Sequence, residues 1–100
     1  MKRPIFIIAE AGVNHNGDLR LAKRLVDAAK ACGADSVKFQ SFKAERIASR
    51  HAALADYQKR SVKADSQLEM IRRLELDEKA HRVLFSYCRK VRIQFLSTPF

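Results

Sequence analysis

Short apolar runs alternate with segments of helical periodicity along this chain, and this alternation constrains the fold more than any other feature. Residues 5–9 form a continuous apolar run rich in Ile, which is typical of a strand covered on both faces, and we expect this first strand over 5–10. Over 19–32 the apolar residues recur three and four apart, which predicts a helix capped by Asp18 and ended by Gly33. With a second strand at 36–42, about thirty-five residues make a βαβ unit of parallel strands.

The connection that follows the second strand is long. Its first part, residues 43–65, is polar, basic and weakly periodic, with a short helix expected near 52–59. Ser66 and Glu69 stand three apart before apolar residues, as in a capping box. This pattern predicts a short helix over 67–74.

The last part of the chain repeats the alternation. Asp77 is placed to cap a strongly amphipathic helix over 78–91, and a third strand is expected at 93–97. The order of elements predicts an α/β fold with parallel strands alternating with helices, either a barrel or an open doubly wound sheet. A barrel closes with eight strands and roughly 250 residues. We therefore expect these 100 residues to be the front part of a larger domain, incomplete by themselves.

The composition is basic, with 20 Lys and Arg against 11 Asp and Glu, a formal net charge of +9. Such an excess fits nucleic acid, an anionic membrane or an anionic small substrate. The basic residues are spread over helix surfaces with few aromatics between them, so a small nucleic-acid-binding or oligomeric interaction module is the weaker interpretation. No apolar stretch approaches the ~18 residues of a membrane span. The run that ends at Glu10 has no cleavage site after it, so we expect a cytoplasmic protein without a membrane partner.

The cysteines and two of the histidines carry little functional signal. Cys32 and Cys88 lie in helical patterns without a Cys or His at ligand spacing, so we expect buried, reduced thiols rather than a disulfide or a metal site. His51 and His81 fall on basic segments expected to be exposed, and we assign them no chemistry.

Polar residues appear where each predicted strand ends. Glu10 follows the first apolar run, Lys38 and Gln40 share one face of the second strand, and Ser97 and Thr98 end the third. A lysine inside a doubly covered strand is costly unless it has a partner or a ligand. Because ligands bind at the carboxyl ends of parallel strands, we expect these five side chains to converge on one pocket. The pocket would suit a phosphate or carboxylate, with Glu10 serving a hydroxyl group or a proton transfer.

Each of these residues also has a purely structural interpretation. Lys38 could be an edge-strand lysine that discourages aggregation, and Glu10 could form only a structural ion pair with it. The two hydroxyl residues of the third strand could be ordinary turn formers. Asn14 and His15 lie in a turn-rich loop after the first strand, where they are either turn residues or possible ligand contacts.

Three stretches together resemble the sialic acid synthase family: IAEAGVNHNGD from Ile8, GADSVKFQ from Gly33 and FLSTPF from Phe95. Its members make N-acetylneuraminic, legionaminic, pseudaminic and phosphorylated neuraminic acids. The resemblance implies that residues 1–100 are the amino-terminal part of a TIM (β/α)8 barrel domain. It also implies a carbon–carbon bond-forming transferase, which condenses phosphoenolpyruvate with an N-acyl amino sugar such as N-acetylmannosamine and releases phosphate.

By motif position, the resemblance implies that Lys38, Thr98 and Ser97 contact phosphoenolpyruvate and that Gln40 contacts the sugar. It implies that Glu10 steadies the reacting centre or its water. A divalent ion, Mn2+ or Mg2+, would polarise the sugar aldehyde in the full-length enzyme, with histidine ligands on later strands and none in this chain. The full-length enzyme is expected to be a homodimer, and the 100-residue chain alone is expected to be inactive.

Overall fold

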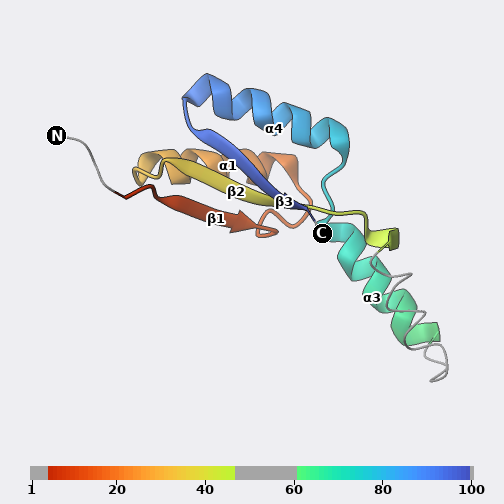
Figure 1. Ribbon diagram of the computed structural model, residues 1–100. Coiled ribbons are helices and arrows are strands. Elements are labelled where there is room, and N and C mark those ends of the chain that lie inside the picture. Colours follow the sequence, from red (N-terminus) through yellow and green to blue (C-terminus); the bar gives the residue numbers. More distant parts are fainter. Residues whose placement is uncertain (1–4, 47–60, 100) are drawn as a thin grey trace.

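Three parallel strands form one sheet in a computed structural model that describes residues 5–46 and 61–99, with side chains between 61 and 67 left out. The strands are β1 (Ile8–Gly12), β2 (Ser36–Ser41) and β3 (Gln94–Pro99), and their order in the sheet is β1-β2-β3. Helix α1 (Leu19–Ala31) joins the first two strands, while α3 (Ser61–Leu74) and α4 (Glu78–Val91) precede the third. The three strand arrows point to the same end of the sheet, and α3 extends away from that end (Figure 1).

The local signals in the sequence account for where two helices begin and end. The carboxylates of Asp18 and Asp77 accept hydrogen bonds from the backbone N–H groups of Arg20 and Ala80, so both predicted caps are confirmed. Helix α1 ends before Gly33, which has φ +84°. In the described part of the chain, no helix is long and apolar enough to cross a membrane.

The sequential strand order fits both architectures that the sequence left open. A right-handed crossover to the next strand always places its helix on the same side of the sheet. Helices α1 and α4 accordingly pack against each other and against the same face (Figure 1). A complete doubly wound sheet has helices on both faces, but each of its halves has them on one face, as a segment of a barrel does. The one-sided cover by α1 and α4 leaves the other face of the sheet without a helix from the described residues.

The hydrophobic core lies between this covered face and the two helices. Val37 and Phe39 project into it from β2 and are completely buried, as is Leu84 of α4. The ring of Phe39 stacks on that of Phe95 with centroids 5.8 Å apart. Burying an aliphatic or aromatic side chain of this size contributes about 1.5–3 kcal/mol. Because β2 is the central strand, these contacts hold the sheet to both helices.

Several expected boundaries differ from the structure. Helix α3 begins at Ser61 rather than at 67, so Ser66 lies inside the helix and the predicted capping box is wrong. No Gly or Pro separates 61 from 74, and a helix propagates through such a stretch. The first strand occupies Ile8–Gly12 instead of 5–10. The short helix expected near 52–59 lies outside the described residues.

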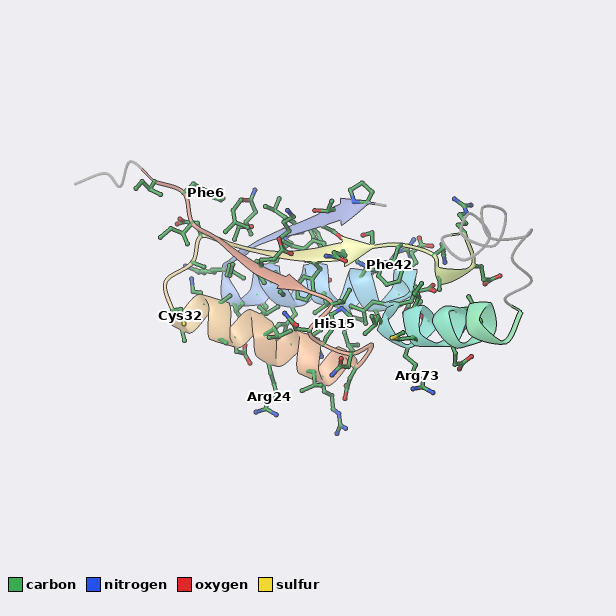
Figure 2. All side chains as sticks on the ribbon, turned by 90° about the horizontal axis from the view of Figure 1, so that it is seen from below. Phe6, His15, Arg24, Cys32, Phe42 and Arg73 are labelled. Atoms are coloured by element: carbon green, nitrogen blue, oxygen red, sulfur yellow. The ribbon has the colours of Figure 1, made fainter. Side chains whose placement is uncertain are left out.

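The two cysteines differ in burial, so the prediction of two buried thiols is half wrong. Cys88 is completely buried, whereas Cys32 is exposed at the carboxyl end of α1. In Figure 2 it lies at the opposite end of α1 from His15. The buried face of α1 is formed by Ala22, Val26 and Ala29, and Cys32 stands one residue past the helix, where the chain turns back toward β2.

Candidate functional site

The uncovered face of the sheet carries an ion pair at its centre. Glu10 of β1 and Lys38 of β2 are neighbours in the parallel register, and Lys38 Nζ lies 3.4 Å from Glu10 Oε1. The Lys38 side chain is 35% exposed and that of Glu10 is 54% exposed. An ion pair this open to solvent contributes at most about 1 kcal/mol to stability. The pair therefore adds little to folding and leaves both charged groups within reach of a ligand.

Gln40 and Thr98 extend this face toward the carboxyl ends of the strands. Gln40 stands two residues beyond Lys38, so the pleat of β2 places both on one side, and Thr98 of β3 is its partner in register. Both side chains are partly buried. With Glu10 and Lys38 they form what we call the polar face: Glu10, Lys38, Gln40 and Thr98.

Gly12 keeps space open within the polar face. The β1–β2 register shifts between Glu10 and Gly12, as in a β-bulge, and Gly12 has φ +57°. A Cβ atom at Gly12 would lie 3.6 Å from Glu10 Oε2 and 3.7 Å from Gln40 Nε2. The missing side chain thus leaves room beside the carboxylate and the amide. Sequence reasoning did not single out Gly12, although its place directly after a strand was a usable signal.

The chemistry of the polar face is mixed. The Lys38 ammonium has three N–H donors, of which Glu10 can occupy one, so it remains able to hold an anionic oxygen. The Gln40 amide both donates and accepts hydrogen bonds, as does the Thr98 hydroxyl. Such a set can bind an anion and a hydroxyl-bearing molecule side by side, with the Glu10 carboxylate available to accept a proton.

Ser97 does not belong to this group, and the prediction that it converges with the others is wrong. Successive residues of a strand point to opposite faces, so Ser97 cannot share a face with Thr98. Its partner in register is Phe39, a core residue, and its hydroxyl group is hydrogen-bonded to that of Ser41 on the covered side. Of the five predicted pocket residues, the structure brings together Glu10, Lys38, Gln40 and Thr98.

His15 supports the β1–α1 loop from inside, and of the two alternatives that the sequence left open for it, the structure favours the turn residue. Its side chain is completely buried, with the ring centroid 6.0 Å from that of Phe39 (His15 is labelled in Figure 2). Its Nδ1 accepts the N–H of Gly17 at 2.8 Å. Burial, with a smaller effect from His81, lowers the pKa of His15 below 6.5. Asn14 is exposed, and its N–H donates to the carbonyl of Ala11.

His81 is a residue that sequence reasoning set aside too early. It is partly buried, and its Nε2 lies 3.3 Å from the Ser41 hydroxyl group. The usable signal was its position three and seven residues before Leu84 and Cys88, which places it beside the apolar face of α4. His51 lies outside the described residues.

The described residues do not by themselves fit a divalent metal ion. Among them, no three His, Cys, Asp or Glu side chains are grouped as metal ligands. The oxygen atoms on the polar face come from one carboxylate, one amide and one hydroxyl group, and a lysine ammonium competes for the carboxylate.

Comparison with known proteins places this geometry in a family. The family model described as the NeuB family matches residues 25–100, which is more than half of the chain. The chain belongs to the NeuB family. It is 56% identical to N,N'-diacetyllegionaminic acid synthase of Campylobacter jejuni over 101 residues, which cover all of this chain and 30% of that protein. It is 39% identical to human N-acetylneuraminate-9-phosphate synthase over 97% of this chain and 27% of that one.

A solved structure supports the same assignment. The N-acetylneuraminic acid synthetase from Leptospira borgpetersenii superposes with a TM-score of 0.73 at 33% identity, over 98% of this chain and 30% of that chain. The chain therefore spans about 30% of the length of these NeuB relatives. This superposition shows that the three parallel strands with helices on one face are the first three strands of a TIM barrel, in which the face without helices is turned toward the interior.

Proposed function

We propose that a full-length NeuB-family protein carrying this chain condenses phosphoenolpyruvate with an N-acyl amino sugar and releases phosphate. The observation that carries the proposal is the Lys38 ammonium, 3.4 Å from Glu10 on the inner face of the barrel strands. Family membership and the names of the relatives agree with it, and they give no support to a nucleic-acid-binding module.

In the proposed reaction, Lys38 and Thr98 hold anionic oxygens of phosphoenolpyruvate, and Gln40 contacts the sugar. The enol carbon attacks the sugar aldehyde, a carbon–carbon bond forms, and the aldehyde oxygen takes up a proton. Water then adds to the cationic carbon that bears the phosphate, and phosphate leaves. The Glu10 carboxylate steadies the cationic centre and can accept the proton of that water.

The remaining parts of the proposal concern the rest of the protein. The divalent ion, Mn2+ or Mg2+, would take its ligands from later strands, because the residues described above do not fit it. We also propose that the full-length enzyme is a homodimer and works in the cytoplasm, where phosphoenolpyruvate is produced.

The test uses a chimera, in which residues 1–100 replace the matching segment of the Campylobacter jejuni synthase to which they are 56% identical. Lys38→Ala should lower kcat/KM for phosphoenolpyruvate by about a hundredfold or more, as expected for removing a charged donor from an active site. The matched control is Lys90→Ala, which removes an exposed lysine of α4. Normal turnover by the Lys38→Ala chimera would refute the proposed role of Lys38.

A further inference from the structure

A chain of hydrogen bonds lies directly behind the polar face, on the covered side of the sheet. The Ser97 hydroxyl group of β3 is hydrogen-bonded to that of Ser41 at the end of β2. The Ser41 hydroxyl group lies 3.3 Å from His81 Nε2, and His81 Nδ1 lies 3.0 Å from the carbonyl oxygen of Asp77, the N-cap of α4. We call Ser97, Ser41 and His81 the rear network.

The carbonyl group at the end of the rear network determines which groups donate and which accept its hydrogen bonds. The carbonyl oxygen of Asp77 can only accept, so His81 Nδ1 carries the proton and donates it. In a neutral imidazole Nε2 is then the acceptor, and the Ser41 hydroxyl group donates to it. The Ser41 oxygen in turn accepts from the Ser97 hydroxyl group. Two strands and one helix are thereby joined through side chains that are each partly buried.

The rear network is coupled to the polar face through the backbone. Ser41 directly follows Gln40, and Ser97 directly precedes Thr98. Because adjacent strand residues point to opposite faces, holding the two serines together behind the sheet holds their neighbours on the front. Gln40 and Thr98 are partners in register, so one link behind the sheet sets the spacing of both.

The rear network lies next to the last pair in the register of β2 with β3, Ser41 and Pro99. Pro99 has no N–H to donate, so this pair has one backbone donor fewer than the others. The side-chain link between Ser41 and Ser97 therefore supplements backbone pairing beside Gln40 and Thr98. The ring of His81 also meets that of Phe95 edge-on, with centroids 6.4 Å apart, which seats the imidazole against the sheet.

We propose that Ser97, Ser41 and His81 are positioning residues, which fix Gln40 and Thr98 in the geometry that binds the two substrates. This inference rests on the proposed function and adds residues that the function did not require. Thr98 is expected to hold an anionic oxygen of phosphoenolpyruvate and Gln40 the hydroxyl-bearing sugar. Loss of the rear network should therefore weaken substrate binding while leaving the reacting groups in place.

The test compares kinetic constants of variants in the chimera. Ser97→Ala and Ser41→Ala each remove the link between the two strands, so each should raise KM for both phosphoenolpyruvate and the sugar by about tenfold, the scale of one lost hydrogen bond. In both variants kcat should change less than about twofold, because no group at the reacting atoms is removed. Ser97→Thr retains a hydroxyl group in a β-branched residue that suits a strand, and it should restore KM. Ser86→Ala, an exposed serine of α4, is the matched control.

Coupling between the members provides a second criterion. Because the two hydroxyl groups share one hydrogen bond, either single variant already removes it. The double variant Ser41→Ala/Ser97→Ala should therefore raise the KM for each substrate no further than either single variant does. Unchanged KM values in the single variants would overturn the proposal. A fall in kcat at constant KM that Ser97→Thr does not reverse would overturn it as well, since that pattern indicates only a loss of folded enzyme.

Hydrogen exchange separates this inference from the proposed function. In Ser97→Ala, peptides covering 38–42 and 95–99 should exchange about tenfold faster than in the parent chimera, since the strand ends lose a cross-link. The same peptides of Ser86→Ala should match the parent. If the parent chimera does not condense the two substrates, the proposed function fails. Unchanged hydrogen exchange of these peptides in Ser97→Ala would overturn the proposed role of the rear network, whether or not the parent chimera is active.

Discussion

The two faces of the sheet divide stability from chemistry, and β2 shows the division residue by residue. Val37 and Phe39 are completely buried against the helices, whereas Lys38 and Gln40 lie on the uncovered face and keep contact with solvent. The pleat alone separates them, since adjacent residues point in opposite directions. Four consecutive residues thus serve the core and the candidate site in turn. Substitutions at 37 and 39 should therefore affect mainly stability, and substitutions at 38 and 40 mainly activity.

The largest expected difference between the faces is in the free energy of unfolding. Phe39→Ala should destabilise the chimera by about 3–5 kcal/mol, because it leaves a cavity in the core. Lys38→Ala should change stability by less than about 1 kcal/mol, because its ion pair with Glu10 is open to solvent. Urea unfolding of both variants measures the difference. Equal losses would show that the two faces are not separate.

Smaller losses of stability are expected from replacing Gly12 or Gly33, which both have a positive φ but lie in different parts of the fold. Gly12 and Gly33 have φ +57° and +84°, so Ala at either position should cost about 1–2 kcal/mol in unfolding free energy. Only Gly12→Ala places a methyl group beside Glu10 and Gln40, and it should lower kcat/KM about tenfold or more. Gly33 has nothing within 4 Å of such a group, so Gly33→Ala is the control. Equal activity in the two variants would contradict an open space at Gly12.

The buried His15 should make the free energy of unfolding depend on pH in the acidic range. Its pKa lies below 6.5 in the folded protein, so below pH 6.5 the unfolded chain binds a proton that the folded chain does not. The free energy of unfolding should therefore fall as the pH drops below 6.5 and stop falling once the pH is below the folded pKa. His15→Asn cannot titrate but can still accept the N–H of Gly17, so the melting temperature of this variant should depend less on pH. Parallel pH profiles would contradict the prediction.

The smallest effect on the folded protein is expected from thiol alkylation. Burial raises the pKa of Cys88 to about 11, and its side chain is inaccessible, whereas Cys32 is exposed. At about pH 8, iodoacetamide should modify Cys32 and spare Cys88. Mass spectrometry of the native chain and of the chain unfolded in urea locates the label. Modification of Cys88 under native conditions would show that the contact between α4 and the sheet opens.

Much of the fold could be predicted because its signals are local. The apolar runs, the helical periodicity and the two Asp caps are properties of short segments, and they placed the three strands and helices α1 and α4 to within about three residues. The start of α3 was misplaced because the capping-box pattern of Ser66 and Glu69 also occurs inside a helix. Alternation within β2 was enough to separate Lys38 and Gln40 from Phe39.

The errors at the site have a different cause. The predicted third strand ended at Ser97 and left Thr98 outside it, so the alternation of faces was not applied to this pair. The strand continues to Pro99, and the pleat turns Ser97 to the covered side. His15 and His81 looked like polar residues of loops and surfaces, yet His15 is buried and His81 is partly buried, each against residues distant in the sequence. The surroundings of these two histidines depend on how distant elements pack together, and a local sequence pattern contains no information on that packing.

The sequence by itself determined which residues are strand and helix and which side chains share a face of a strand, because these follow from a repeat of two or 3.6 residues along one segment. Only the tertiary structure decided that both helices lie on one face, that Lys38 meets Glu10, and that Ser97, Ser41 and His81 join behind them. The physical reason is that these contacts depend on strand order and register, which are set by packing between segments 28 to 56 residues apart.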